Sequence, residues 1–181
     1  ILNLIPLPPL DGSNIIALRA IQEMARKAGY NTLILSSTVE GEARDVAKVY
    51  SAIAKEITTS GCPIPSPACV IAGGETTVTI SGKGLGGRNQ ELCLAAAISI
   101  RDTDNVVILS AGTDGSDGPT DAAGGVVDST TIERARELDI NATEYLKNND
   151  SYHFLQKVGD LLITGPTNTN VMDIQIILVG K

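Results

Sequence analysis

Residues 73–91 (GGETTVTISGKGLGGRNQE) combine the residue types that proteins use to hold a small anion. Four of the six residues at 82–87 are glycine, so the backbone there can turn sharply and present its N–H groups. Arg88 adds a fixed positive charge whose fork suits a phosphate or a carboxylate. An apolar run from Leu92 predicts a helix, whose positive end should face the same volume. We expect an anion site here, and the alternative is a glycine-rich connector whose Arg88 pairs with a nearby acid.

A second polar stretch, residues 112–125 (GTDGSDGPTDAAGG), follows an apolar run and carries Asp114, Asp117 and Asp121 beside flexible glycines. Loops of this length in compact domains are usually functional. Carboxylate oxygens suit magnesium, which proteins often hold through one or two carboxylates and the phosphates of a substrate. We therefore expect a magnesium site formed by these three residues. The alternative is a solvated acidic turn whose carboxylates cap local N–H groups.

A third polar loop, residues 165–170 (GPTNTN), offers hydroxyl and amide groups to phosphate or sugar oxygens, or serves only as a turn between two strands. Each of the three loops follows a predicted strand. Ligands of open α/β sheets bind beyond the carboxyl ends of the strands, so the three loops should form one site. His153 is the only histidine and lies beside Phe154 and Leu155, which favours a structural role over acid–base chemistry.

A dinucleotide site is a competing interpretation, because Gly82, Gly84 and Gly87 match the G-x-G-x-x-G pattern between a predicted strand and a predicted helix. Two observations weigh against it. The preceding strand is expected in a hairpin rather than in a βαβ unit, and the helix starts with polar residues 88–91 (RNQE). No Walker A pattern occurs in the chain.

The hydrophobic pattern alternates strands with helices, which predicts an α/β fold of three α/β/α layers around a mixed, mainly parallel sheet. Residues 68–72 and 76–81 are expected to form a hairpin joined at Gly73 and Gly74. Residues 1–10 (ILNLIPLPPL) begin like a strand, but their prolines cannot continue a ladder. The other predicted strands are residues 32–36, 105–111, 161–164 and 174–179, and the helices are residues 15–28, 40–58, 130–138, 141–147 and 151–158, besides the one from Leu92.

The 181 residues, 43% of them hydrophobic, are enough for a full core. The proline-rich loop at 61–67 is the best boundary, so we expect residues 1–61 to trail from an amino-terminal domain or lead into an α/β domain at 62–181. A net charge of −7 without a basic run argues against nucleic acid and anionic membranes as partners. Three cysteines without metal-ligand spacing indicate reduced thiols and a cytoplasmic location.

Four motifs in order, GGETTVTISGKGLGGRNQE, SAGTDGSDGPTDAAGG, NNDSYHF and LLITGPTNTNV, closely resemble the carboxyl-terminal MOFRL domain of the type 2 glycerate kinases, a family once labelled hydroxypyruvate reductase. The resemblance is dense over residues 68–179, and residues 11–58 look like the segment that leads into that domain. It implies a two-domain enzyme that phosphorylates glycerate with ATP in the cleft between its domains. The amino-terminal domain, which supplies an active-site lysine in that family, is not matched here, so we expect no turnover by this chain alone.

Carried over by motif, the resemblance implies that Arg88 holds the substrate carboxylate or the phosphates. Asp114 and Asp117 would serve magnesium or the transferring phosphate, with Asp114 a guess for the base. We expect Arg88 and Asp114 to be catalytic and the metal ligands to be Asp114, Asp117 and Asp121. The expected substrate- and phosphate-binding residues are Gly84, Gly86, Gly87, Asn89, Thr113, Thr167 and Asn170.

The expected partners are glycerate, a nucleotide and the missing amino-terminal domain, with a homodimer left open. Two other functions stay open. One is an NAD(P)H-dependent hydroxypyruvate reductase, and the other is a non-catalytic domain that docks onto a separate subunit.

Overall fold

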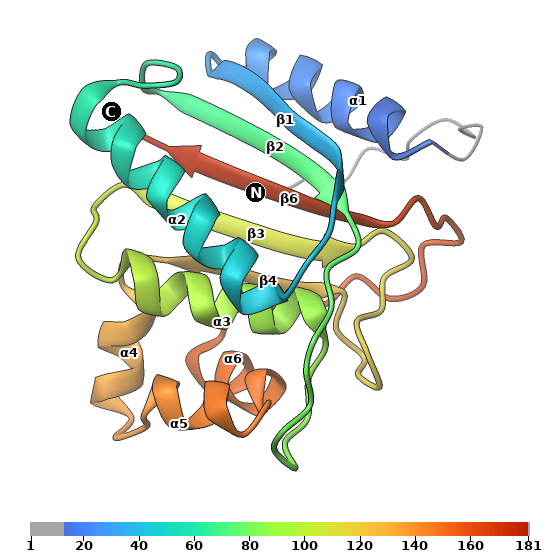
Figure 1. Ribbon diagram of the computed structural model, residues 1–181, viewed down its shortest axis with the longest axis vertical. Helices are drawn as coiled ribbons and strands as arrows, with labels where there is room; N and C mark the ends of the chain where they lie inside the picture. Colours follow the sequence, from blue (N-terminus) through green and yellow to red (C-terminus); the bar gives the residue numbers. More distant parts are fainter. Residues whose placement is uncertain (1–12, 181) are drawn as a thin grey trace.

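The computed structural model describes residues 13–180, so the strand-like start expected at residues 1–10 lies outside the described residues (Figure 1). The helices are α1 (Asn14–Lys27), α2 (Ala43–Ser60), α3 (Arg88–Ile100), α4 (Thr131–Glu137), α5 (Ala142–Lys147) and α6 (Ser151–Val158). The strands are β1 (Asn31–Val39), β2 (Ala68–Gly74), β3 (Val106–Gly112), β4 (Gly124–Asp128), β5 (Leu161–Leu162) and β6 (Asp173–Val179).

The strands form a single mixed sheet in the order β1-β2-β6-β3-β4-β5. The expected α/β fold with a mixed sheet is confirmed, but its pairing is not mainly parallel. Only β1 and β2 pair in parallel, whereas β6 enters between β2 and β3 and runs antiparallel to both. The β4 and β5 strands add antiparallel pairs at the far edge. The difference arises because the sequence shows where β6 lies along the chain but not which strands it separates.

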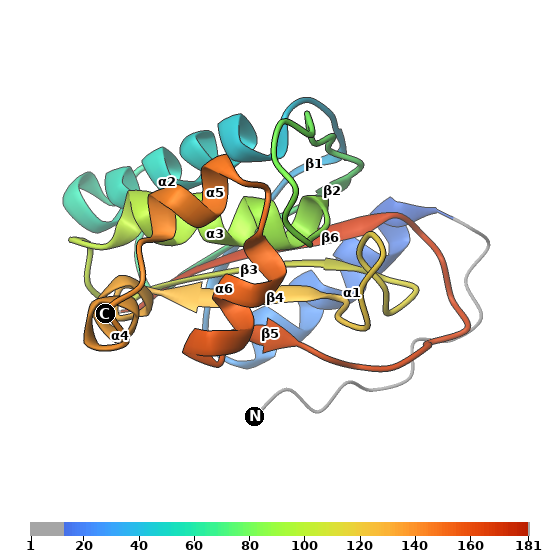
Figure 2. The same cartoon turned by 90° about the horizontal axis from the view of Figure 1, so that it is seen from below.

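Helices cover both faces of the sheet, which confirms the three layers (Figure 2). α1 lies on one face, where Leu18 packs with Cys69 and Ile71 of β2. α2 and α3 cover the other face over the larger core cluster. Residues 89–97 of α3 are all buried because this helix lies between the sheet and the other helices, which explains its uninterrupted apolar run. Within residues 13–180, no helix is both long and apolar enough to cross a membrane.

The hairpin expected from residues 68–72 and 76–81 is wrong. β2 pairs with β1 and β6 instead, and residues 76–81 leave the sheet with a single isolated bridge between Glu42 and Thr77. Side chains replace the missing neighbour strand, since the Glu42 carboxylate accepts from the Thr79 N–H at 2.8 Å. β-Branched residues favour an extended backbone there, but extension does not supply a partner.

The described part of residues 1–61 shares the sheet with the rest of the chain. β1 pairs with β2 from Asn31↔Ala68 to Val39↔Gly74, across the boundary expected near residue 61. α2 also contributes Tyr50 and Ile57 to the main core cluster. α1, β1 and α2 therefore pack as one body with residues 62–180, while the division of the chain into domains stays a prediction.

Three loops meet at one edge of the sheet. The last residues of β2 and β3, Gly74 and Gly112, are both paired with Asp173, the first residue of β6. Residues 75–87, 113–123 and 163–172 leave the sheet at this edge, on the right in Figure 1. We call these three loops the loop edge. Their shared position agrees with the expectation from the sequence.

Candidate functional site

Arg88, the first residue of α3, is held at the loop edge by two carboxylates. Its Nε donates to Asp173 Oδ2 at 2.6 Å and its Nη2 to Asp173 Oδ1 at 2.9 Å. Nη2 also donates to Glu75 Oε1 at 3.0 Å. The hydrogen bonds from Arg88 to Asp173 keep the pKa of the guanidinium well above its usual range, so Arg88 is a permanent cation.

Asp173 is fully buried where it holds Arg88. Its backbone carbonyl accepts from the side-chain amide of Asn14 at 2.9 Å, and the same amide donates to the Val171 carbonyl at 2.7 Å. The start of β6 is thus fixed from both faces, by α1 and by α3. The sequence analysis did not select Asp173, although a signal existed, because β6 alternates and puts Asp173 on the same inward face as Ile177 and Val179.

Asp117 caps the N-terminus of α3, where we expected a ligand anion. Its Oδ1 accepts from the Asn89 N–H at 3.1 Å and its Oδ2 from the Gln90 N–H at 2.9 Å. A Cβ on Gly87 would lie 2.3 Å from Asp117 Cγ, so glycine is needed for this close approach. The roles expected for Asp117 as a metal ligand, and for Gly87 and Asn89 in phosphate binding, do not fit this geometry, because the carboxylate already occupies the helix end.

The N–H groups of residues 82–85 in the glycine loop are also in use. Asn149 Oδ1 accepts from Ser81 and Gly82 at 2.8 and 2.9 Å, and the Asn148 carbonyl accepts from the Gly84 N–H at 2.9 Å. Cβ atoms on Gly84 and Gly86 would lie 2.3 Å from Asp150 Cβ and 2.2 Å from Ser151 Oγ. The phosphate-binding role expected for Gly84 and Gly86 is therefore replaced by docking against the turn between α5 and α6.

The docked turn is tied to the helix layer by a buried carboxylate. Asn149 Nδ2 donates to Glu91 Oε2 at 2.9 Å, and Arg44 of α2 donates to Glu91 Oε1 at 2.7 Å through Nη2. Glu91 is buried on α3, three residues after Arg88. The glycine loop, α2 and α3 thus share one polar network, and a rigid support lies behind Arg88.

Thr113, Asp114 and Thr167 come together at the loop edge. The Thr167 N–H donates to the Asp114 carbonyl at 3.1 Å, and Thr113 Oγ1 donates to the Met172 carbonyl at 2.7 Å. Asp114 Oδ1 accepts from the Ser116 N–H at 3.0 Å. Asn170 lies on the same loop as Thr167 and caps Met172, with its Oδ1 accepting from that N–H at 3.2 Å.

Asp114 also lies near the carboxylate that holds Arg88. A Cβ built on Gly112 would be 3.1 Å from Asp114 Oδ1 and 3.7 Å from Asp173 Oδ1. Arg88 and Asp114, the two residues expected to be catalytic, therefore belong to one small region of the loop edge. This region, formed by Arg88, Asp173, Glu75 and Asp114, is the candidate site.

Asp121 belongs to a different contact, since its Oδ1 accepts from the Tyr152 hydroxyl at 2.7 Å. Among residues 13–180, no group of three or more His, Cys, Asp or Glu side chains is placed to hold a metal. The expected trio of Asp114, Asp117 and Asp121 is therefore not assembled as one metal site. His153 pairs with Asp150 at 2.6 Å through Nδ1, next to the glycine loop.

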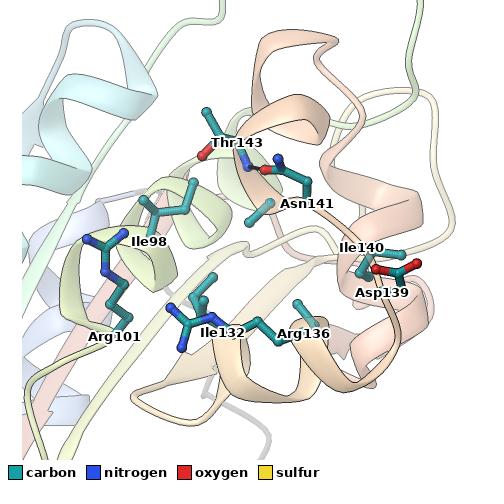
Figure 3. Close-up of a pocket in the computed structure, with 10 residues that line it drawn as sticks. Ile98, Arg101, Ile132, Arg136, Asp139, Ile140, Asn141 and Thr143 are labelled. Carbon is teal, nitrogen blue, oxygen red and sulfur yellow. Dashed lines mark hydrogen bonds between the residues drawn. The ribbon is translucent and has the colours of Figure 1, made fainter.

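Two cavities of the described residues lie away from this site. One, of about 380 Å³, is lined by the C-terminal end of α3 together with α4 and the start of α5, including Ile98, Arg101 and Arg136 (Figure 3). The other, of about 520 Å³, lies between Lys55 of α2 and the turn after α3, at residues 102–104. Arg88 begins α3 and Arg101 follows its last residue, so the candidate site is at the opposite end of this helix.

The charge at the candidate site is predominantly negative. Glu75 and Asp173 contact Arg88 directly, Asp117 acts on it electrostatically, and Asp114 lies beside Asp173. A second anion next to Arg88 would need additional positive charge to be held firmly. The Arg88 guanidinium can orient an oxyanion.

The α/β fold and the motifs at its loop edge define the class of this protein. The model of the MOFRL family matches residues 68–173, and the chain belongs to that family.

Similar proteins include glycerate kinases of two organisms. The chain is 48% identical to "D-glycerate 2-kinase" of Thermotoga maritima over 87% of its length, and 47% identical to "Glycerate 2-kinase" of Pyrococcus horikoshii over 94%. A crystal structure of the Thermotoga maritima glycerate kinase superposes with a TM-score of 0.92 at 45% identity and covers 93% of this chain. The chain spans only 38% and 39% of the length of these two relatives and 41% of the chain in the crystal structure.

Replacing Asn149 should loosen the glycine loop. Asn149→Ala removes the acceptor that Ser81 and Gly82 share. Hydrogen exchange at these two amides should therefore accelerate roughly ten- to a hundredfold, which corresponds to a loss of about 1–3 kcal/mol in the free energy that protects them. Exchange followed residue by residue with NMR measures this. Asn141→Ala is the matched control, because Asn141 caps only α5. Equal exchange rates in both variants would show that Asn149 does not hold the loop.

Burial raises the pKa of Asp117 from its ordinary 3.8 to about 6. Between these two pH values the folded state binds more protons than the unfolded state, so the free energy of unfolding should fall as the pH rises. The unfolding free energy of the wild type, minus that of Asp117→Asn, should decrease by roughly 2–3 kcal/mol from pH 4 to pH 7. Urea unfolding at each pH measures the difference, and an increase would refute the raised pKa.

Proposed function

We propose that this chain is the carboxyl-terminal part of an ATP-dependent glycerate kinase, a phosphotransferase whose other part supplies the facing wall of the active site. The observation that carries the proposal is the joint position of Arg88 and Asp114 at the loop edge. The likeness to the kinases of Thermotoga maritima and Pyrococcus horikoshii supports the reaction.

Arg88 would orient the anionic end of a substrate. Its Nη1 has no hydrogen-bond partner within residues 13–180 and carries two N–H groups that a carboxylate or phosphate oxygen can accept. Asp173 keeps the guanidinium in place while this happens, because its carboxylate is buried and cannot follow the ligand. Phosphoryl transfer depends mainly on such positioning and on charge stabilisation.

Magnesium fits Asp114 better than the trio expected from the sequence. Only Oδ1 of this carboxylate accepts a hydrogen bond among the described residues, so Oδ2 is left for a cation. A single carboxylate is sufficient where phosphates supply other ligands of the ion. When bound, magnesium would neutralise charge on the transferring phosphate. Thr113 and Thr167 would keep the Asp114 loop in place through their bonds within the loop edge.

The acidic surroundings of Arg88 support a second wall. The relatives are longer than this chain, which spans 38% and 39% of the two kinases. We assign the additional positive charge, including the lysine expected from the family resemblance, to the part of those proteins that this chain does not match. The cleft between the two parts would then bind glycerate and the nucleotide.

A hydroxypyruvate reductase has less support from the geometry. Dinucleotide sites use free N–H groups of a glycine loop and the start of a helix to hold the pyrophosphate. Here Asn148 and Asn149 accept from the loop N–H groups, and Asp117 occupies the start of α3. The N–H groups of residues 82–85 and the first N–H groups of α3 at residues 89 and 90 are therefore already paired inside the chain.

An assay of the complete polypeptide that carries this domain separates these functions. Glycerate with ATP should release ADP, while hydroxypyruvate should not oxidise NADH. The 181-residue chain alone should show neither activity. NADH oxidation without ADP release would replace the kinase by the reductase, and neither activity in the complete polypeptide would leave a non-catalytic domain.

Arg88→Ala in the complete polypeptide should lower kcat/KM roughly 30- to 1000-fold, equivalent to about 2–4 kcal/mol of transition-state stabilisation. Arg88→Lys keeps the charge but not the fork, so it should also lose activity while it stays paired with Asp173. Circular dichroism establishes that both variants are folded.

Arg101→Ala is the matched control, because Arg101 lies at the other end of α3 and pairs only with Asp102. Near-normal activity of Arg88→Ala would remove Arg88 from the site. A loss as large in Arg101→Ala would assign the effect to the helix rather than to the anion.

A further inference from the structure

We infer that Glu75 is an internal competitor for the anionic ligand of Arg88: its carboxylate occupies one arm of the guanidinium fork and must leave before an oxyanion can bind both terminal nitrogens. This inference rests on the proposed function, since it assigns Arg88 to the binding of a substrate carboxylate or phosphate. It adds a residue that sets how strongly, and for which anions, the site binds.

The donors of Arg88 are divided unequally. A guanidinium has five N–H groups, and three of those of Arg88 are used, two by Asp173 and one by Glu75. Asp173 takes the side formed by Nε and Nη2. Glu75 takes the remaining hydrogen of Nη2, next to the two that Nη1 has left over. An oxyanion that binds end-on to both terminal nitrogens therefore needs the hydrogen that Glu75 holds.

The two carboxylates differ in how easily they can be displaced. The Asp173 side chain is fully buried, whereas that of Glu75 is 55% exposed. An exposed carboxylate regains water when it leaves, so its ion pair contributes little. The buried Asp173 carboxylate would lose the positive charge that compensates it and would gain no water, so it stays paired with Arg88. A ligand that approaches from solvent thus exchanges with Glu75 and not with Asp173.

The backbone permits this exchange without rearrangement. The Glu75 N–H donates to the Val39 carbonyl at 3.0 Å, which continues the pairing of β1 and β2. The preceding Gly74 lies close to Val39: a Cβ added to Gly74 would be 2.3 Å from the backbone N and O atoms of Val39. The backbone at this point is therefore fixed, and only rotation of the Glu75 side chain is required.

The exchange also selects among anions. A ligand that replaces one carboxylate must offer at least two oxygens to the fork, or more charge than a carboxylate, to gain free energy. Carboxylate and phosphate groups meet this condition, but a single-atom anion such as chloride does not. Glu75 therefore stays paired with Nη2 of Arg88 until an anion with at least two oxygens displaces it.

Titration of the 181-residue chain tests the inference, with the Arg88 Nε–H signal in NMR as the readout. Inorganic phosphate and D-glycerate are titrated in separate arms at constant ionic strength, so that the phosphate and carboxylate sources are distinguished. Glu75→Gln keeps the shape of the side chain and removes its charge. It should tighten the binding of at least one of these probes about two- to fivefold, which is the range expected for an exposed ion pair.

Glu40→Gln is the matched control, because Glu40 is an exposed acid that follows the last residue of β1 as Glu75 follows the last residue of β2. It removes one negative charge without freeing Arg88, so it should change binding less than Glu75→Gln does. Equal tightening in the two variants would reduce the effect to net charge and overturn the inference. Unchanged or weaker binding in Glu75→Gln would also overturn it, because Glu75 would then be no competitor.

These outcomes are independent of the kinase assay. Tighter binding to Glu75→Gln in a protein without ADP release would remove the proposed reaction and keep the competitor. ADP release together with unchanged binding to Glu75→Gln would keep the proposed reaction and remove the competitor role of Glu75.

Discussion

The ion pair between Asp173 and Arg88 is the constraint on which the rest of this structure depends. It joins the first residue of β6 to the first residue of α3, and Asn14 adds the start of α1 to the same point. The Asp173 carboxylate is fully buried while Arg88 is 36% exposed, so removing Arg88 would leave a buried negative charge without compensation. The pair therefore fixes three elements relative to one another and also aims the free side of the guanidinium at the loop edge.

Carboxylates dominate the loop edge, but they serve different purposes. Asp117 caps a helix, Asp121 receives a tyrosine hydroxyl, and Asp173 anchors an arginine. Asp114 and Glu75 are left as the acids that a ligand or a cation can engage. This division explains why a cluster that looks like a metal site in the sequence contains at most one residue suited to magnesium. It also explains why the site needs positive charge from elsewhere.

Much of the fold could be predicted because local patterns carry it. The predicted positions of the helices and of five of the strands agree with the structure to within a few residues. Pairing was harder, since nothing local shows that β6 separates β2 from β3. β4 (Gly124–Asp128) was missed because its two glycines continue a polar glycine loop.

The candidate site was predicted in part. Arg88 and Asp114 were expected at one edge of the sheet, and both lie at the loop edge, while their catalytic roles stay predictions. The docking of the glycine loop was not predicted, since its partners, Asn148 and Asn149, lie more than 60 residues further along the chain. Glycine allows the backbone to approach a protein segment as closely as it allows approach to a phosphate. The residue type alone cannot distinguish the two uses.

The central position of β6 also affects how the chain is made. β6 is the last of the described strands to be synthesised, yet it is the strand that joins β2 to β3 in the sheet. A nascent chain that has not reached Asp173 would carry two partial sheets with open edges, and open edges invite aggregation. The sheet can therefore close only after residues 173–179 have been synthesised.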